Sequence, residues 1–336
     1  MSKAGNRKKL MAVCAAAIAL FFVAAIRPVS AQAPTPPRSK PSTSTHIGGN
    51  SFLGPRDIIY VPTRPVSDTL ADMYFGDWRN SEPKVMFGSL IVRDILTQGD
   101  NFSPPFPGAA LQFAKFLSYG KLEPGARTLP STLQGLQVFF YVSDGEGEVS
   151  AGGRTEPLHK GSALLVPEGL EFTLHNTGTT ELTAYMVGDP TYPGFKPLPS
   201  FAIKDEDTLR RGPHHAPSPS PFTNQGATAH WAHIEAGFFG KNNGLATVGG
   251  ISTVAILPMQ MGEPHPHYPG HEEVWCAVEG KSLAFYGSQL RIQQPGQAFM
   301  LRPDNVTTHS SINFEEPGDK PVNFLWFAEG LKTASH

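Results

Sequence analysis

The feature that most constrains the fold is a β-strand pattern that occurs twice. In the first half, "LQVFFYVSDGEGEVSAGG" gives a strand, a glycine turn and a second strand, and "KGSALLVPEGLEFTLHNTG" follows it. In the second half, "HEEVWCAVEGKSLAFYGSQ" is followed by "PGQAFMLRPDNVTTHSSIN". Each half reads as strand, turn, strand, then Gly, an apolar strand, Pro, a turn and a strand that ends at Asn. The duplication predicts two β-units in an all-β chain.

Composition supports this organisation and excludes one class of partner. A chain of 336 residues is too long for one ordinary core. The 34 Gly and 32 Pro favour short strands joined by tight turns over long helices. With 27 Lys+Arg against 29 Asp+Glu, the chain has no basic excess to neutralise phosphates, so we expect no nucleic-acid partner.

The N-terminus has the arrangement of an export signal. Basic residues precede the apolar run 10–26, and small residues then offer cleavage after Ala31 or Ala33. The alternative is an uncleaved anchor helix, because the run is at the lower limit for spanning a bilayer. The small residues after the apolar run favour a cleaved signal peptide that comprises residues 1–31. The protein is then expected to be periplasmic or secreted, with no stable membrane anchor. Cys276 is then the only cysteine left, so an internal disulfide is excluded.

The rest of the chain divides by composition into four segments. Residues 32–45 are rich in Pro, Ser and Thr and predict an extended linker. Residues 46–195 are expected to form the first domain, with a β-rich leading part at 84–96. A second breaker-rich stretch lies within 196–230 and predicts a connection. The second domain then occupies 231–336.

Two motifs in the second half carry a resemblance to a known family. The residues of the first motif are His265, His267, Glu273 and Gly280. The residues of the second are Gly296, Pro303, His309 and Asn313. Their types and order resemble the two motifs of the cupin superfamily, specifically of two-domain cupins. The first motif departs from the family pattern in two ways, because five residues separate His267 from Glu273 and the leading Gly262 is closer than usual. Either Glu272 or Glu273 is therefore eligible as the carboxylate ligand. The second motif has six residues between Gly296 and Pro303, Asn305 in place of a glycine, and three residues before His309.

The resemblance implies two tandem jelly-roll barrels, of which the first is degenerate. Gly161, Pro167, Gly169 and Asn176 fit the second motif. Phe172, however, occupies the histidine position. Counting back from Gly145 places Val138 at the glutamate position and Pro130 and Thr132 at the two histidine positions. The first barrel is thus expected to bind no metal.

The second barrel is expected to hold one transition metal ion. Residues two apart on a strand share a face, so His265 and His267 project together. The resemblance adds Glu273 and His309, which completes three imidazoles and one carboxylate. This set suits Fe, Mn, Ni, Co, Cu or Zn without distinguishing among them, and it leaves positions open for water, dioxygen or substrate. The competing interpretation is an exposed histidine-rich loop, and the spacing of His309 favours the metal site.

Neighbouring residues are candidates for proton transfer and for covering the site. Tyr268, His271 and Glu272 are expected on a loop at the barrel mouth, where one of them, or Glu273 itself, could act as general acid or base. Trp275 should face inward with Glu273. The run "VWCAV" is apolar on both faces, so its outer face should be covered, either by the first barrel or by a second chain in a homo-oligomer.

The function predicted from these features is that of an exported metal-dependent enzyme. Cupins with this ligand set include dioxygenases and decarboxylases, which would make the chain an oxidoreductase or lyase acting on a small chelating hydroxy, phenolic or carboxylate compound. The alternative is a non-catalytic, metal-containing module that binds a sugar or an acid. The fold cannot choose between them.

Overall fold

The structure, a computed structural model, describes residues 71–213, 233–262, 264–316 and 318–330. These residues belong to one compact unit that spans 64–336. The predicted signal, the linker and residues 214–230 of the predicted connection lie outside the described residues. Within the described ranges, no helix combines the length and apolar character that crossing a membrane requires.

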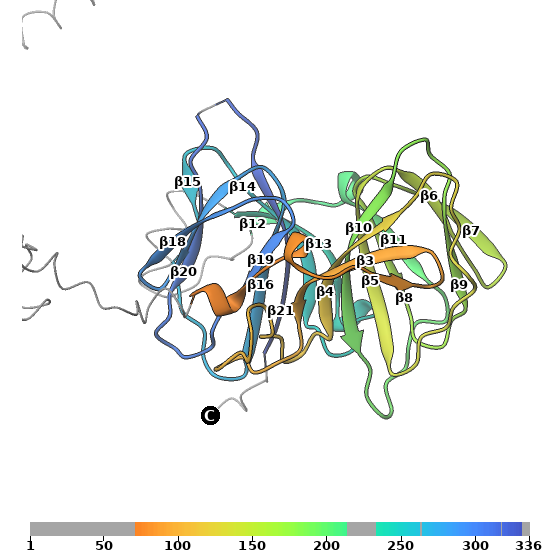
Figure 1. Cartoon of the computed structure of the whole chain (residues 1–336), viewed down its shortest axis with the longest axis horizontal. Coiled ribbons are helices and arrows are strands. Elements are labelled where there is room, and N and C mark those ends of the chain that lie inside the picture. Colours follow the sequence, from red (N-terminus) through yellow and green to blue (C-terminus); the bar gives the residue numbers. More distant parts are fainter. Residues whose placement is uncertain (1–70, 214–232, 263, 317, 331–336) are drawn as a thin grey trace, which may run out of the picture. The chain divides into compact units, whose positions relative to one another are not determined.

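The first barrel consists of two antiparallel sheets (Figure 1). The larger sheet has the order β11 (Ala202–Asp205), β8 (Ser162–Val166), β5 (Leu136–Asp144), β10 (Leu182–Pro190), β4 (Phe116–Leu122), β3 (Leu90–Thr97) and β2 (Lys84–Met86). The smaller sheet has the order β7 (Arg154–His159), β6 (Glu146–Ala151) and β9 (Phe172–Asn176). The β-rich part predicted at 84–96 corresponds to β2 and β3.

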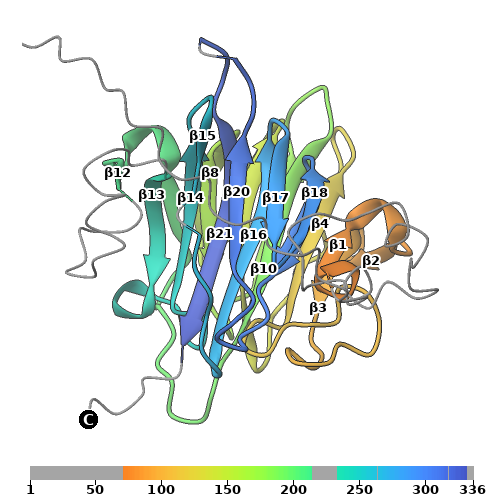
Figure 2. The same cartoon turned by 90° about the vertical axis from the view of Figure 1, so that its left-hand side faces the viewer.

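The second barrel repeats this plan (Figure 2). Its larger sheet has the order β1 (Phe75–Asp77), β19 (Gln297–Met300), β16 (His271–Glu279), β21 (Val322–Gly330), β14 (Gly250–Ile256), β13 (His233–Gly240) and β12 (Gly212–Pro213). Its smaller sheet has the order β15 (Gln260–Met261), β20 (His309–Asn313), β17 (Ser282–Tyr286) and β18 (Gln289–Gln293). Three short 3₁₀ turns, η1 (Trp78–Asn80), η2 (Glu206–Thr208) and η3 (Lys241–Asn243), join strands. The predicted all-β class with two jelly-roll barrels is confirmed.

The larger sheets of the two barrels pack against each other. Aromatic residues of the first barrel and strands of the second belong to one buried cluster. Within it, the rings of Phe139 and Phe238 are 6.0 Å apart, and the hydroxyl of Tyr185 donates to the carbonyl oxygen of Ala277 at 3.3 Å. Cys276 is fully buried there. Of the two covers predicted for "VWCAV", the first barrel is therefore the one present.

Each barrel also takes a strand from outside its predicted segment. β1 precedes the first barrel in sequence but pairs with β19 of the second, with Phe75 opposite Phe299. β11 lies in the predicted connection but pairs with β8 of the first barrel. β1 therefore belongs to the second barrel although it lies within 46–195, and β11 belongs to the first barrel although it lies within 196–230. Pairing between strands that are far apart in sequence has no local sequence pattern, so these two pairings could not be predicted.

Two buried carboxylates hold a loop of the opposite barrel. Glu272 in β16 accepts hydrogen bonds from the backbone N–H groups of 112–114, which precede β4. Asp189 in β10 accepts hydrogen bonds from the backbone N–H groups of 246–248, which precede β14, at 2.7–2.8 Å. Buried N–H groups are costly to leave unpaired, so the two carboxylates stabilise the contact between the barrels.

Candidate metal centre

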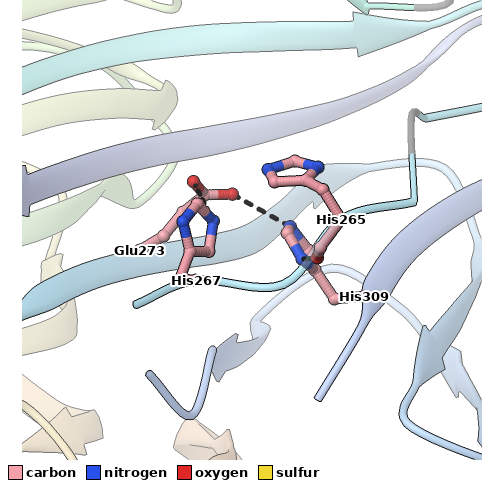
Figure 3. Close-up of side chains that lie close together, drawn as sticks. All are labelled: His265, His267, Glu273 and His309. Carbon is pink, nitrogen blue, oxygen red and sulfur yellow. Dashed lines mark hydrogen bonds and ion pairs between the residues drawn. The ribbon is translucent and has the colours of Figure 1, made fainter. Parts of the chain in front are cut away.

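Four side chains of the second barrel converge at one end of its smaller sheet (Figure 3). One candidate ligand atom from each of them lies within 4.8 Å of all the others. We call this group the histidine–glutamate cluster, and its members are His265, His267, Glu273 and His309. Two ligands on opposite sides of one ion, each about 2.1 Å from it, would be roughly 4.2 Å apart. The observed span is close to that value.

Backbone pairing brings the three histidines together. His265 forms an isolated bridge with His309, the first residue of β20, through two backbone hydrogen bonds of 3.2 and 3.3 Å. The carbonyl oxygen of His267 accepts from the backbone N–H of Asn305 at 2.7 Å. Asn305 has φ 63°, a left-handed conformation that Asn tolerates better than most residues. Asn305 can therefore replace the glycine of the motif without changing this turn.

Glu273 is at the centre of the cluster and is 2% exposed. Its carboxylate is 2.9 Å from His267 Nε2 and 3.0 Å from His309 Nε2, and it accepts a hydrogen bond from Trp275 Nε1 at 2.5 Å. Burial alone would raise the pKa of Glu273, but the hydrogen bonds from His267, His271 and His309 hold that pKa well below its ordinary value. The carboxylate is therefore ionised at neutral pH.

The residues present fit a metal ion. His309 Nδ1 is 2.8 Å from the carbonyl oxygen of His265 and must donate to it, because a carbonyl only accepts. His309 Nε2 also faces an acceptor, the carboxylate of Glu273, and a neutral imidazole cannot donate from both nitrogens. Either a second proton on His309 or a metal ion at Nε2 removes this conflict, and the ion gives the usual arrangement, in which the second nitrogen of a ligand histidine donates to a carbonyl. Burial also lowers the pKa of His267, which favours the neutral form that binds metals.

The structure separates the two glutamates that the sequence left as alternatives. Glu273 lies in the cluster, while Glu272 points to the opposite face of β16 and binds the backbone of 112–114. Adjacent residues of a strand face opposite sides, so only one of the two can reach the ion. The geometry assigns Glu273 as the candidate ligand. It also places the carboxylate of Glu272 outside the cluster, which disfavours the catalytic role predicted for it.

The other two candidates for proton transfer lie beside the cluster. His271 stacks on His267, with ring centroids 4.1 Å apart, and its Nε2 is 3.7 Å from the carboxylate of Glu273. Tyr268 is 44% exposed, with its ring 5.5 Å from that of His271. The prediction that all three candidates belong to a loop is wrong for His271 and Glu272, which are the first residues of β16.

Sequence reasoning missed one polar contact of the site. Trp275 was predicted as an inward-facing wall, but its indole N–H also donates to Glu273. The spacing could have indicated this contact, because Trp275 follows Glu273 by two residues and so lies on the same face of β16. A buried Trp usually needs an acceptor for its N–H, and the ligand carboxylate supplies it.

The first barrel has the same backbone arrangement with different side chains. Ser131 forms an isolated bridge with Phe172, as His265 does with His309, and Gly169 donates to the carbonyl oxygen of Leu133, as Asn305 does to His267. The two histidine positions therefore correspond to Ser131 and Leu133. The predicted counterparts, Pro130 and Thr132, are each off by one residue. Val138 and Phe172 lie in the core of this barrel.

Comparisons with known proteins concern the fold. Residues 118–188, which belong to the first barrel, match the family described as "Cupin domain". No curated protein sequence matches the chain.

Similar solved structures include protein Ylba from E. coli, with 12% identity, a TM-score of 0.55, and coverage of 80% of this chain and 99% of that one. Oxalate decarboxylase from Lactobacillus farciminis, solved as a formate complex, has 13% identity, a TM-score of 0.52, and coverage of 77% and 88%. The bacterial pirin YhhW from Escherichia coli, solved with nickel(II), has 12% identity, a TM-score of 0.51, and coverage of 76% and 97%. At such identities the likeness establishes the architecture alone.

Proposed function

We propose that the chain is a two-barrel member of the cupin superfamily and a metal-dependent enzyme with one ion in the histidine–glutamate cluster. The proposed reaction is oxygenation by a dioxygenase or loss of carbon dioxide by a decarboxylase. The proposed substrate is a small hydroxy, phenolic or carboxylate compound that can chelate the ion.

The observation that carries the proposal is the convergence of three imidazoles and one ionised carboxylate in a largely buried position. A bound Fe or Mn ion would supply both redox and Lewis-acid chemistry there, whereas Zn would supply Lewis-acid chemistry alone. The similar L. farciminis protein is an oxalate decarboxylase, which supports the proposal of a decarboxylase, and the similar pirin was solved with nickel(II), which supports the proposal of a metal ion.

The surrounding residues have distinct tasks in this proposal. Trp275 fixes the orientation of Glu273 through its indole N–H, and its ring centroid is 6.3 Å from that of His309, so it limits the room beside the ligands. His271 presents its ring next to the cluster, where it can hydrogen-bond to a substrate oxygen. Tyr268 is exposed enough to contact a substrate as it enters.

The test combines metal analysis with turnover. Purified protein reconstituted with Fe, Mn, Ni or Zn is incubated with phenolic, hydroxy-acid and dicarboxylate compounds, with and without oxygen. We expect at least one metal form to convert a compound and the His265→Ala variant to be inactive. The His159→Ala variant is the control, because His159 is an exposed histidine of the first barrel. If several compounds bind reversibly and are recovered unchanged with every metal, the binding-module alternative replaces the enzyme.

We also propose that the protein is exported to the periplasm or secreted. The proposal rests on the basic segment, apolar run and small-residue exit of the N-terminus. N-terminal sequencing of protein recovered from the exported fraction should begin at Gln32 or Pro34. An intact Met1 chain in the membrane fraction would support the uncleaved anchor instead.

A further inference from the structure

A polar cavity lies between the two barrels, and none of the four residues of the histidine–glutamate cluster lines it. Its volume is about 290 Å³, close to the lower end of the roughly 300–1,000 Å³ of small-molecule sites. Lys160, Glu206 and Arg211 line it from the first barrel and the segment after β11, and Glu279 and Asn323 line it from the second barrel. We call it the interbarrel cavity, and all of its lining residues belong to the described part of the chain.

The two larger sheets have the same strand order, so residues at this cavity have counterparts on the other side of the contact between the barrels. β11 and η2 of the first sheet correspond to β1 and η1 of the second. The backbone N–H of Glu206 donates to the carbonyl oxygen of Gly161 at 3.1 Å, and that of Trp78 donates to the carbonyl oxygen of Gly296 at 3.4 Å. Glu206 and Trp78 therefore occupy equivalent positions.

The two equivalent positions are packed differently. Trp78 stacks on Tyr119, with ring centroids 5.0 Å apart, and the ring of Tyr119 lies 5.2 Å from that of Tyr185. Glu206 instead accepts a hydrogen bond at 2.8 Å from the hydroxyl of Thr253, the counterpart of Tyr119 in strand pairing. Large aromatic rings fill the contact on one side, whereas smaller polar side chains border the cavity on the other. The fold itself therefore does not require a cavity here.

Each barrel has a β-bulge at the cavity. Val278 in β16 is left unpaired where the register with β21 shifts, and Ser143 in β5 is left unpaired where the register with β10 shifts. Both of these residues line the cavity. Bulges bend a strand and are frequent next to active sites. The cavity is thus located where both larger sheets depart from regular pairing.

Charged groups in the cavity form neutralised pairs. The carboxylate of Glu206 accepts a hydrogen bond from Arg211 at 3.1 Å. The carboxylate of Glu279 accepts from the amide of Asn323 at 3.2 Å and lies 3.8 Å from Lys160 Nζ. The side chains of Lys160, Arg211 and Glu279 are still 40–60% exposed, so their remaining hydrogen-bonding groups can reach a ligand.

We propose that the interbarrel cavity binds a small neutral compound with several hydroxyl groups, such as a monosaccharide. A hydroxyl group both donates and accepts, so one hydroxyl can donate to Glu279 and accept from Lys160 without separating the two. The charges that line the cavity nearly cancel, because two cations face three carboxylates. They belong to Lys160, Arg211, Glu206, Asp207 and Glu279. A charged ligand would be attracted by one member of each pair and repelled by the other, whereas a neutral ligand is not.

Calorimetric titration of the metal-loaded full chain with glucose, galactose, ribose and inositol tests the proposal. We expect at least one of them to bind, and Glu279→Ala to raise its dissociation constant about tenfold, because a hydrogen bond to a charged group is lost. Glu206→Trp introduces the residue of the filled side and should abolish binding. Glu181→Ala is the matched control and should bind as the parent does, since Glu181 is also 40% exposed and paired with a lysine.

His265→Ala should bind the same compound with the affinity of the parent, because the cavity is separate from the histidine–glutamate cluster. Circular dichroism establishes that each variant is folded. Weaker binding in folded Glu279→Ala, with unchanged binding in Glu181→Ala and His265→Ala, supports the proposal. Loss of binding in His265→Ala would place the ligand at the cluster and overturn it. Unchanged binding in Glu279→Ala, or a parent chain that binds none of the four compounds, also overturns it.

Discussion

The strand β20 of the second barrel begins at His309, whereas its counterpart β9 in the first barrel begins at Phe172. Both strands end at an asparagine that is fully buried. Asn313 donates to the carbonyl oxygen of Ile256 at 2.9 Å, and Asn176 donates to that of Leu122 at 2.8 Å. This hydrogen bond at the end of the strand is thus the same in the two barrels, while the residue at its start differs.

The shared backbone therefore indicates that this type of barrel does not need a metal ion for its shape. In the first barrel Phe172 is 1% exposed, and its ring lies 5.2 Å from that of Phe87 and 6.4 Å from that of Phe140. Apolar packing fills the space where the second barrel gathers polar ligands. The ligands of the second barrel are therefore expected to serve function more than folding.

The largest expected effect is the loss of metal when one ligand is removed. The parent chain should bind one ion, and His309→Ala should retain less than about one tenth of it, since losing a direct ligand costs more than the roughly 10–100-fold that losing an outer partner costs. Elemental analysis after dialysis measures the content. His159→Ala is the control, and about two firmly held ions in the parent would contradict the contrast between the barrels.

The next largest effect is expected in the core of the first barrel. Phe172→Ala leaves a cavity among Phe87 and Phe140 and should lower the free energy of unfolding by about 3–5 kcal/mol. Denaturant unfolding measures the loss, and metal content should stay that of the parent. If Phe172→Ala released the metal while the chain remained folded, the metal site of the second barrel would depend on the packing of the first, against this prediction.

The fold and the ligand set were predictable because their signals are local. Repeated strands with Gly and Pro between them mark the two barrels, and the types and order of His265, His267 and Glu273 mark the ligand set. The expectation that His265 and His267 share a strand face is wrong, because His265 forms only an isolated bridge and His267 lies in a loop, while Glu273 lies on β16. The counterparts in the first barrel were misassigned because the loop between the bridge and the next strand is one residue shorter. Eight positions separate His265 from Glu273, but seven separate Ser131 from Val138. A shift of one residue moves every side chain to the other face.

The features that sequence could not provide depend on contacts between distant segments. β1 joins the sheet of the second barrel through pairs more than two hundred positions apart, such as Phe75 with Phe299. Glu272 binds backbone N–H groups of 112–114, which carry no side-chain signature. From the sequence, Glu272 and Glu273 are equally eligible as the ligand. Only the structure shows which of them faces the cluster.

The two adjacent glutamates give a further test, in which the expected loss of stability is smaller than for Phe172→Ala. Glu272→Gln keeps the size of the side chain but replaces one acceptor oxygen by an NH₂ group that faces backbone N–H groups, so it should destabilise the fold by about 1.5–3 kcal/mol. Its metal content should match that of the parent. Glu273→Gln, measured beside it, should lose metal. Equal metal content in the two variants would remove the basis for choosing Glu273 as the ligand.

The smallest expected effect concerns the turn that both barrels share. Gly169 has φ 79° and Asn305 has φ 63°, and each donates its backbone N–H to the residue at the second histidine position. An alanine in this conformation is strained by about 1 kcal/mol, and a Cβ added at Gly169 meets no atom within 4 Å, so Gly169→Ala should cost only this strain. Asn305→Ala should cost a similar amount and Asn305→Gly only a few tenths, because glycine adopts the left-handed region freely. Thermal unfolding of the three variants measures the costs, and a large loss in Asn305→Gly would show that the Asn305 side chain has a role in the second barrel that the glycine of the first barrel lacks.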